Sequence, residues 1–338
     1  MNNKSRHISW VWAIIFLLGM VQIGLPANKK LAQTGFQFLS VTSDARAGAM
    51  GEAMTTVSTY SSALFFNPAG MARLPQFGDF SFSQNQWIAD INYNTFGLAL
   101  RPAGGKYGVF GFSLLSVDYG ELQGTMVWDN VQGFRDTELF YPSALAFGFG
   151  YAKALSDKFA VGGQVKSAHQ YLGRNVVPVT DSTSEVSKNV AQAVAFDFGT
   201  IYRTGWKSFT FGMSVRNFSN EIKYQSEGFQ LPLTFRIGGS MDLFDFLNNR
   251  TPSQTLLLSI DALHPRSYAE RLNLGLEYTL RDFLSLRTGY LFNYDERGVT
   301  AGFGVHKTIA GLFLEIDYAY TPFGLFDSVQ RLTVQMRF

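Results

Sequence analysis

The sequence predicts an all-β fold, a transmembrane antiparallel β-barrel of about 14 strands with an N-terminal plug of small-residue helical turns. Three observations favour this fold. From Phe77 onward, segments of about ten residues alternate between apolar and polar side chains. The connections between these segments are short and long in turn. The last segment, Arg331–Phe338, alternates as a strand does and ends on an aromatic residue.

The composition agrees with this fold and excludes several classes of function. The chain has 338 residues, a formal net charge of +2, 46% hydrophobic residues and 16% charged residues, whereas soluble domains carry about 25% charged residues. A nearly neutral net charge gives no reason to expect nucleic acid as a partner. Because the chain contains no cysteine, it has no disulfides, thiolate metal sites or cysteine nucleophile.

Residues 1–32 have the pattern of a signal peptide. A basic start precedes the apolar run Trp10–Ile23, which is shorter than the roughly 20 residues of a transmembrane helix. Cleavage after Ala27 or Ala32 is compatible with the residue types, and an uncleaved anchor is the alternative. No later apolar run is long enough for a transmembrane helix, so a membrane-spanning structure requires a closed barrel.

Residues 33–76 are predicted to form a plug inside the barrel of residues 77–338. The plug sequence is rich in Ala, Gly, Ser and Thr. Its N-cap signals predict one helix over Ala45–Met54 and another over Ala63–Phe66. Asn67-Pro68 is expected to end the second helix, because proline removes a backbone donor.

Six plug residues are candidates for contact with a ligand or a partner: Asp44, Arg46, Gly48, Gly51, Asn67 and Pro68. Asp44 and Arg46 also fit an N-cap and an ion pair to the barrel wall. The two glycines fit close packing against the wall. Asn67-Pro68 fits either a helix end or a hinge whose movement opens a passage.

The predicted barrel strands share the period-two alternation. In order they begin at Phe77 and continue as Asn92–Arg101, Tyr107–Val117, Leu145–Ala152, Phe159–Tyr171, Ala191–Arg203, Phe209–Asn217, Leu233–Asp242, Thr255–Leu263, Arg271–Leu280, Phe283–Phe292, Val299–His306, Leu312–Tyr320 and Arg331–Phe338. Single-chain bacterial barrels need an even number of such strands.

The loop lengths give an orientation. Connections such as Pro102–Gly105 and Ser156–Lys158 are short and even-numbered, whereas Asp118–Phe140, Gly173–Val190 and Phe218–Gln230 are long and odd-numbered. Outer-membrane barrels have short periplasmic turns and longer extracellular loops. With a periplasmic N-terminus, the three long connections are predicted to be extracellular loops of modest size.

The two faces of the strands predict different surroundings. The apolar face, rimmed by Trp87, Tyr93, Trp206 and Tyr320, is expected to contact outer-membrane lipid. The other face carries Gly, Ser and Thr together with charges of both signs: Lys166, Arg216, Arg236, Asp261, Arg271, Glu277, Arg287, Glu315 and Asp317. Mixed charges favour a lumen that pairs with itself and with a plug over an ion-selective channel.

No catalytic arrangement can be assembled from the sequence. His169, His264 and His306 are far apart and lack metal-ligand spacing. No nucleophile, base and orienting group can be named together. A non-enzymatic protein without cofactor or metal is therefore expected.

Two motifs resemble known families. Asp44–Gly51, preceded by Phe38-Leu39, resembles the opening signature of the PorV/PorQ family of outer-membrane proteins associated with type IX secretion. Asn67-Pro68-Ala69 resembles a motif in the N-terminal hatch of the FadL-type fatty-acid channels, to which that family is structurally related. The first resemblance implies contacts with secretion-apparatus proteins or exported cargo.

Two functions follow as hypotheses. The first is an accessory outer-membrane barrel in type IX protein secretion and surface attachment. The alternative is a FadL-like channel for small hydrophobic molecules, for which Phe65, Phe66 and Met71 could line a pocket between plug and wall. The terminal Phe338 also fits the strand that the barrel-insertion machinery of the outer membrane recognises.

Overall fold

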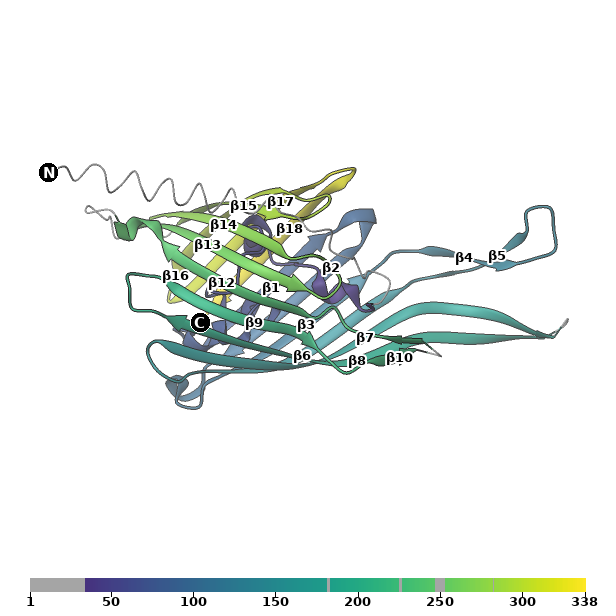
Figure 1. The fold of residues 1–338 in the computed structure, drawn as a ribbon, viewed down its shortest axis with the longest axis horizontal. Helices are drawn as coiled ribbons and strands as arrows, with labels where there is room; N and C mark the ends of the chain where they lie inside the picture. The colour runs from purple at the N-terminus through teal and green to yellow at the C-terminus, as the bar shows by residue number, and fades with distance from the viewer. Residues whose placement is uncertain (1–33, 181–182, 225–226, 247–252, 282) are drawn as a thin grey trace.

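The computed structural model describes residues 34–180, 183–224, 227–246, 253–281 and 283–338. The predicted signal peptide, residues 1–32, lies outside these ranges. Fourteen antiparallel strands close into one barrel (Figure 1), which confirms the predicted fold class. The barrel strands are β1 Gly78–Gln86, β2 Asn92–Leu100, β3 Val109–Asp118, β6 Ser143–Ala154, β7 Phe159–Thr180, β8 Thr183–Arg203, β9 Thr210–Phe218, β12 Thr234–Asp242, β13 Gln254–Pro265, β14 Arg271–Leu280, β15 Leu284–Phe292, β16 Val299–Ile309, β17 Leu312–Phe323 and β18 Phe326–Arg337.

The barrel closes between its first and last strands. β1 pairs with β18 from Asp79 opposite Arg337 to Gln86 opposite Gln330. The amide of Gly78 also donates to the carbonyl of Phe338 at 2.7 Å. Closure leaves no unpaired strand edge in the barrel, which is the condition for a sheet to exist in lipid.

The two ends of the barrel differ as the loop lengths predicted. The C-terminus lies at the end that carries the tight turns, which include η7 Pro102–Gly105 and η8 Leu243–Phe246; we call this the turn end. The opposite end, the loop end, carries η6 Ile88–Asp90 and all the long connections. By the rule for bacterial barrels, the turn end is periplasmic and the loop end extracellular.

The long connections are not modest loops, as the sequence had suggested, but β-hairpins that project from the loop end (Figure 1). β4 Leu122–Val127 pairs with β5 Phe134–Phe140, and β7 and β8 continue as a paired ribbon to Thr180 and Thr183. A small third hairpin joins β10 Ile222–Tyr224 to β11 Glu227–Phe229. Strand pairing continues there because two neighbouring antiparallel strands go on satisfying each other's backbone groups beyond the membrane.

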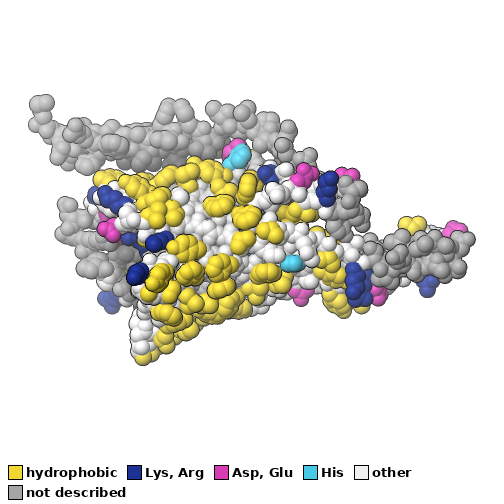
Figure 2. Space-filling model, turned by 90° about the horizontal axis from the view of Figure 1, so that it is seen from below, with side chains coloured by type: hydrophobic (Ala, Val, Ile, Leu, Met, Phe, Trp, Pro, Cys, Tyr) yellow, Lys and Arg dark blue, Asp and Glu magenta, His cyan; other side chains and the backbone are white. Residues whose placement is uncertain are grey.

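An apolar belt surrounds the barrel. Figure 2 shows apolar side chains gathered over the middle of one face, with lysines and arginines toward its ends. Exposed belt residues include Phe82, Phe112, Phe147, Phe198, Phe303 and Ile316. A closed barrel with such a belt is stable only when lipid covers it. The protein is therefore an outer-membrane barrel, and among the described residues no helix could cross a membrane.

Two of the four predicted girdle aromatics do not face lipid. Trp206 and Tyr320 are exposed, but Tyr93 is buried and Trp87 packs edge-on against it. The reason is strand parity, because Tyr93 shares the inward face of β2 with Thr95, Gly97 and Ala99. By contrast, the charges predicted to face the lumen are all buried or half-buried.

The plug fills the lumen and runs along it from the loop end to the turn end. It begins at Thr34, which bridges to Gln230 of the loop end. It ends near Arg73, whose Nη2 donates to the carbonyl of Ser156 at 3.0 Å in a turn-end connection. The plug therefore starts at the extracellular end and crosses the barrel before β1 begins. The predicted periplasmic position holds for the start of β1 and not for the start of the plug.

The plug is less helical than its sequence predicts. Its elements are η3 Gln37–Ser40, α2 Ala45–Ala49, η4 Tyr60–Phe65 and η5 Pro68–Arg73, of which only α2 is an α-helix. The helix predicted to Met54 stops early because Gly51 and Glu52 adopt left-handed φ angles of 57° and 61°. Ser61 and Ser62 do not cap a helix: η4 starts after Thr59 without a side-chain cap.

Small residues on the wall make room for the plug. A Cβ on Gly275 would lie 2.5 Å from the carbonyl oxygen of Met50, and one on Gly162 would lie 2.5 Å from the amide of Ala69. Contacts this close are possible only for glycine. The small inward residues noted in the sequence thus have a steric function, which is to let plug backbone lie directly on strand backbone.

Candidate functional site

Asp44 and Arg46 anchor α2 to the barrel wall. Asp44 caps the helix, with its Oδ1 accepting from the amide of Ala47 at 2.8 Å. Arg46 donates from Nε and Nη2 to the two carboxylate oxygens of Glu277, at 2.8 and 2.7 Å. A two-pronged guanidinium–carboxylate contact fixes orientation as well as distance. Asp44 thus stabilises the helix of the plug, and Arg46 ties that helix to the barrel wall.

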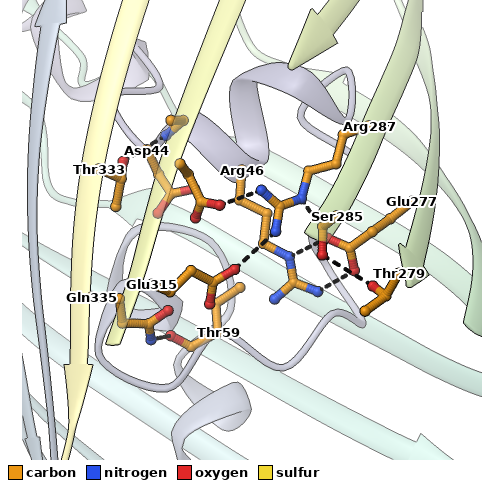
Figure 3. A network of polar contacts seen from close by, with 12 residues as sticks. Asp44, Arg46, Thr59, Glu277, Thr279, Ser285, Arg287, Glu315, Thr333 and Gln335 are labelled. Carbon is orange, nitrogen blue, oxygen red and sulfur yellow. Dashed lines mark hydrogen bonds and ion pairs between the residues drawn. The ribbon is translucent and has the colours of Figure 1, made fainter. Parts of the chain in front are cut away.

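Glu277 is part of a larger charge network (Figure 3). Arg287 on β15 reaches Glu277 at 2.5 Å and Glu315 at 2.9 Å, and also pairs with Asp317. Its side chain is only 1% exposed. With Arg46, two cations thus face three carboxylates on β14 and β17. The network joins the partly exposed Arg46 of the plug to buried charges on the wall, and removing one partner of a buried ion pair is strongly destabilising.

Gly48 and Gly51 lie where α2 meets the wall. A Cβ on Gly48 would be 2.8 Å from Cδ of Arg331. The guanidinium of Arg331 is held by the carbonyl of Thr42 at 2.9 Å. At Gly51 the left-handed φ and the backbone of Leu274, 2.7 Å from an added Cβ, both require glycine.

Asn67 and Pro68 follow directly on the end of η4, as the sequence predicted, and they also begin the next helical turn. Asn67 is the N-cap of η5, and Pro68 is its first residue, the position in which proline is favoured. Asn67 Nδ2 donates to the carbonyl of Thr55 at 2.7 Å and to that of Thr200 on β8 at 3.2 Å. One amide thus ties two parts of the plug to the wall.

A cavity with a volume of about 310 Å³ lies at the loop end, above the plug; we call it the loop-end cavity. Its lining combines arginines, aromatic rings and carboxylates from the plug, β9, β12, β13 and β14. Those used below are Val41, Glu52, Trp87, Arg216, Arg236, Leu263, Arg266, Tyr268, Arg271, Tyr294, Asp295, Glu296, Arg297 and Phe323.

Aromatic rings hold two of these arginines in place. The guanidinium of Arg271 lies 4.0 Å from the ring centroids of both Tyr268 and Tyr294. Arg297 lies 4.6 Å from Tyr294 and pairs with Glu52 at 2.7 Å. Burial alone would raise the pKa of Glu52, but Arg297 and Arg236 outweigh it and lower the pKa. Glu52 is therefore a carboxylate at neutral pH.

Two smaller cavities lie farther along the plug. One of about 30 Å³, the seam cavity, shares Val41 and Arg216 with the loop-end cavity and is also lined by Phe65 and Phe66. The other, of about 50 Å³, lies toward the turn end beside Gly70; we call it the turn-end cavity. Met71, the third residue proposed to line a pocket, is instead fully buried in an apolar cluster with Leu64.

The six candidate residues and the loop-end cavity do not coincide. Asp44 lines the seam cavity, whereas none of the six lines the loop-end cavity. Sequence reasoning placed Arg216, Arg236 and Arg271 inside the lumen without grouping them. The sequence did contain a signal that could have grouped these three arginines, because each lies near the loop end of its strand. In addition, Arg236 pairs with Ser214, which is two residues before Arg216 on the neighbouring strand.

Several solved structures share the fold of this chain. The chain is similar to the toluene transporter TbuX of Ralstonia pickettii, with 12% identity and a TM-score of 0.56 over 87% of this chain and 98% of that one. It is similar to the toluene transporter TodX of Pseudomonas putida, with 12% identity and a TM-score of 0.58 over 86% and 96%. A FadL homologue of Pseudomonas aeruginosa matches with 12% identity and a TM-score of 0.50 over 88% and 98%.

These structural neighbours are FadL-type barrels, and the likeness concerns the fold. No protein-family model matches the sequence, and no curated protein matches it either.

Proposed function

We propose that this barrel is an outer-membrane channel for small, largely apolar molecules, which pass along the contact between plug and wall. One observation carries the proposal. The loop-end cavity, the seam cavity and the turn-end cavity follow one another from loop end to turn end, and each is lined in part by β8 or β9. An accessory barrel that only docks partners has no need for such a series.

Two barriers interrupt the route. Val41 and Arg216 stand between the loop-end and seam cavities, because both cavities are lined by them. Asn67 lies in the chain between Phe66, which lines the seam cavity, and Ala69, which lines the turn-end cavity. We propose Asn67-Pro68 as the hinge. Its side-chain hydrogen bonds to the carbonyls of Thr55, Thr200 and Met213 can be exchanged for others when η5 moves.

The structural neighbours support this direction. TbuX and TodX are described as toluene transporters, and the likeness to this chain extends over nearly their whole length. Small ligands also favour concave sites that combine apolar surface with placed polar groups, and the seam cavity combines Leu39, Phe65 and Leu115 with polar residues such as Ser113.

Cells that carry the barrel are expected to take up an apolar dye faster than cells without it. The probe is 1-N-phenylnaphthylamine, which lipopolysaccharide excludes and which fluoresces in lipid. Val41→Trp fills the junction of the two upper cavities and should return uptake to the rate of cells without the barrel. The measurement is the initial fluorescence rate at equal amounts of folded barrel.

The matched control is Val131→Trp, because Val131 is fully exposed on the β4–β5 connection. It should leave dye uptake unchanged. Equal uptake by Val41→Trp and wild-type cells would remove the plug–wall route from the proposal.

A second function is favoured by a different observation. The β4–β5 hairpin projects from the loop end and exposes Val127, Trp128, Val131 and Phe134 to solvent. Exposed apolar groups outside the membrane belt mark contact surfaces. With the resemblance of Asp44–Gly51 to the PorV/PorQ signature, this surface supports an accessory role in type IX secretion through protein contacts.

Crosslinking in native outer membranes tests this role. Purification of the barrel should recover secretion-apparatus proteins or exported cargo, and the double variant Val127→Asp/Val131→Asp should lose most of them. Leu325→Asp is the control, because Leu325 is equally exposed but lies in the β17–β18 connection. Recovery of the same proteins with all three barrels would count against the hairpin as the contact surface.

A further inference from the structure

More arginines than carboxylates line the loop-end cavity. Five arginines line it, against the carboxylates of Glu52, Asp295 and Glu296. Glu52 is already paired with Arg297. Glu296 turns toward the β17–β18 connection, where its Oε2 accepts from the amide of Leu325 at 3.4 Å. No ion pair among the described residues joins Arg216, Arg236 or Arg271 to a carboxylate.

Three of these guanidinium groups have a buried nitrogen without a hydrogen-bond partner. Nε of Arg216, of Arg236 and of Arg271 is each buried and unpartnered. Arg216 is 8% exposed and Arg236 is 4% exposed. Folded proteins rarely leave a buried donor unsatisfied, and the cost is larger for a charged donor. Among the described residues these three side chains have a donor that no acceptor meets, and all three side chains line one cavity.

The plug holds two of these arginines by their ends. Arg216 Nη2 donates to the carbonyl of Leu39 at 3.3 Å, and Arg236 Nη1 donates to the carbonyl of Glu52 at 3.2 Å. Each of these contacts uses one terminal nitrogen of a guanidinium whose side chain also lines the cavity. Among the described residues, Arg271 is held by the rings of Tyr268 and Tyr294 alone. The donors are thus positioned in advance of any ligand.

We infer that the loop-end cavity binds an oxyanion, a carboxylate or a phosphate, carried on a small flat apolar body. Guanidinium groups match such anions because their forked donors meet two oxygens at once. The apolar part of the ligand is met by Trp87, Leu263 and Phe323 in the same lining. A neutral hydrocarbon offers no acceptor to these guanidinium groups, and a cation is repelled by the arginines.

This inference deepens the proposed channel function, because it names the class of molecule that the entrance cavity takes. It is tested by binding alone, without a transport step. Binding can therefore fail while dye uptake stands, and dye uptake can fail while binding stands.

The experiment measures binding to the purified barrel in lipid nanodiscs by calorimetry. The probes are benzoate, phenyl phosphate and toluene, which share one ring and differ in the attached group. At least one anion should bind at least about tenfold more tightly than toluene, the gain expected from charge-assisted hydrogen bonds. The tighter anion identifies carboxylate or phosphate as the ligand group.

Two variants remove single donors. Arg236→Gln and Arg271→Gln should each weaken binding of the anion about tenfold or more and leave toluene unchanged. Arg135→Gln is the control for loss of charge, because Arg135 lies on β5 outside the barrel, and it should bind as wild type does. Folding of each variant is checked by the heat-dependent gel migration of intact barrels.

If Arg236→Gln does not fold, Arg271→Gln decides the test. Among the described residues the Arg271 guanidinium contacts only the rings of Tyr268 and Tyr294, so its removal breaks no hydrogen bond of the fold. Toluene binding as tightly as both anions would overturn the inference. So would wild-type anion affinity in the folded arginine variants.

Discussion

Gly289→Ala is expected to unseat the plug and open the barrel. A Cβ at this position of β15 would lie 2.5 Å from the carbonyl carbon of Met50 and 2.7 Å from Cα of Gly51. Because both are backbone atoms, no side-chain rotation relieves the contact. Overpacking costs about 1–3 kcal/mol, and rigid backbone on both sides places this change at the upper end. A cost of about 3 kcal/mol lowers the ratio of seated to unseated plug by about a hundredfold.

The measurement is sensitivity of cells to vancomycin, which an intact outer membrane excludes, together with proteolysis of the plug in purified barrels. Both should rise. Gly163→Ala is the matched control on β7, because the nearest atom to its added Cβ is 3.5 Å away, an ordinary contact. If Gly289→Ala cells excluded the antibiotic as wild-type cells do, the plug would be held by contacts other than this backbone seat.

Arg287→Met is expected to destabilise the folded barrel more than any surface charge change. The substitution leaves Glu277 with Arg46 alone and leaves Glu315 and Asp317 without their shared cation. Breaking a buried ion pair from one side costs about 3–5 kcal/mol. The free energy of unfolding, measured by urea titration in detergent micelles, should fall by about this amount.

Arg281→Gln is the control, because Arg281 is exposed in the turn before β15, and surface changes are usually within about 0.5 kcal/mol. Adding Asp317→Asn to Arg287→Met should recover part of the lost stability, because one uncompensated charge is then removed. A double variant less stable than Arg287→Met would contradict the account of the network as charge compensation.

Together these two changes separate the two ways in which the plug is held. Gly289 acts through shape, because it lets backbone meet backbone. Arg287 acts through charge, because it binds Glu277, the wall carboxylate that also receives Arg46 of the plug. A channel plug has to be seated firmly enough to close the lumen, and neither of these two contacts involves the hinge proposed at Asn67-Pro68.

The strand pattern was predictable because it is local. In β14, Leu272 and Leu274 alternate with Arg271 and Asn273, and a period of two places each set on its own face regardless of what lies opposite. The number of strands, the inward charges and the ordering of loop lengths followed from that pattern. So did the presence of a plug, since small inward residues need something to pack against.

The length and direction of the plug elements were not predictable in the same way. Alanines and glycines over residues 45–54 suit a helix by propensity. The chain leaves the helix at Gly51 because it must follow the wall, where Leu274 and Tyr290 allow no Cβ. Trp87 and Tyr93 likewise looked lipid-facing by residue type, but the pleat of β2 and the rings around it turned them inward.

The sequence by itself determined that this protein is a plugged outer-membrane barrel, because alternation, loop order and the terminal strand are properties of neighbouring residues. Only the tertiary structure decided which inward charges find partners. Arg287 and Arg216 look alike in sequence, yet barrel closure places three carboxylates around the first and a cavity beside the second. The difference arises from strands and plug residues far apart along the chain, which only folding brings together.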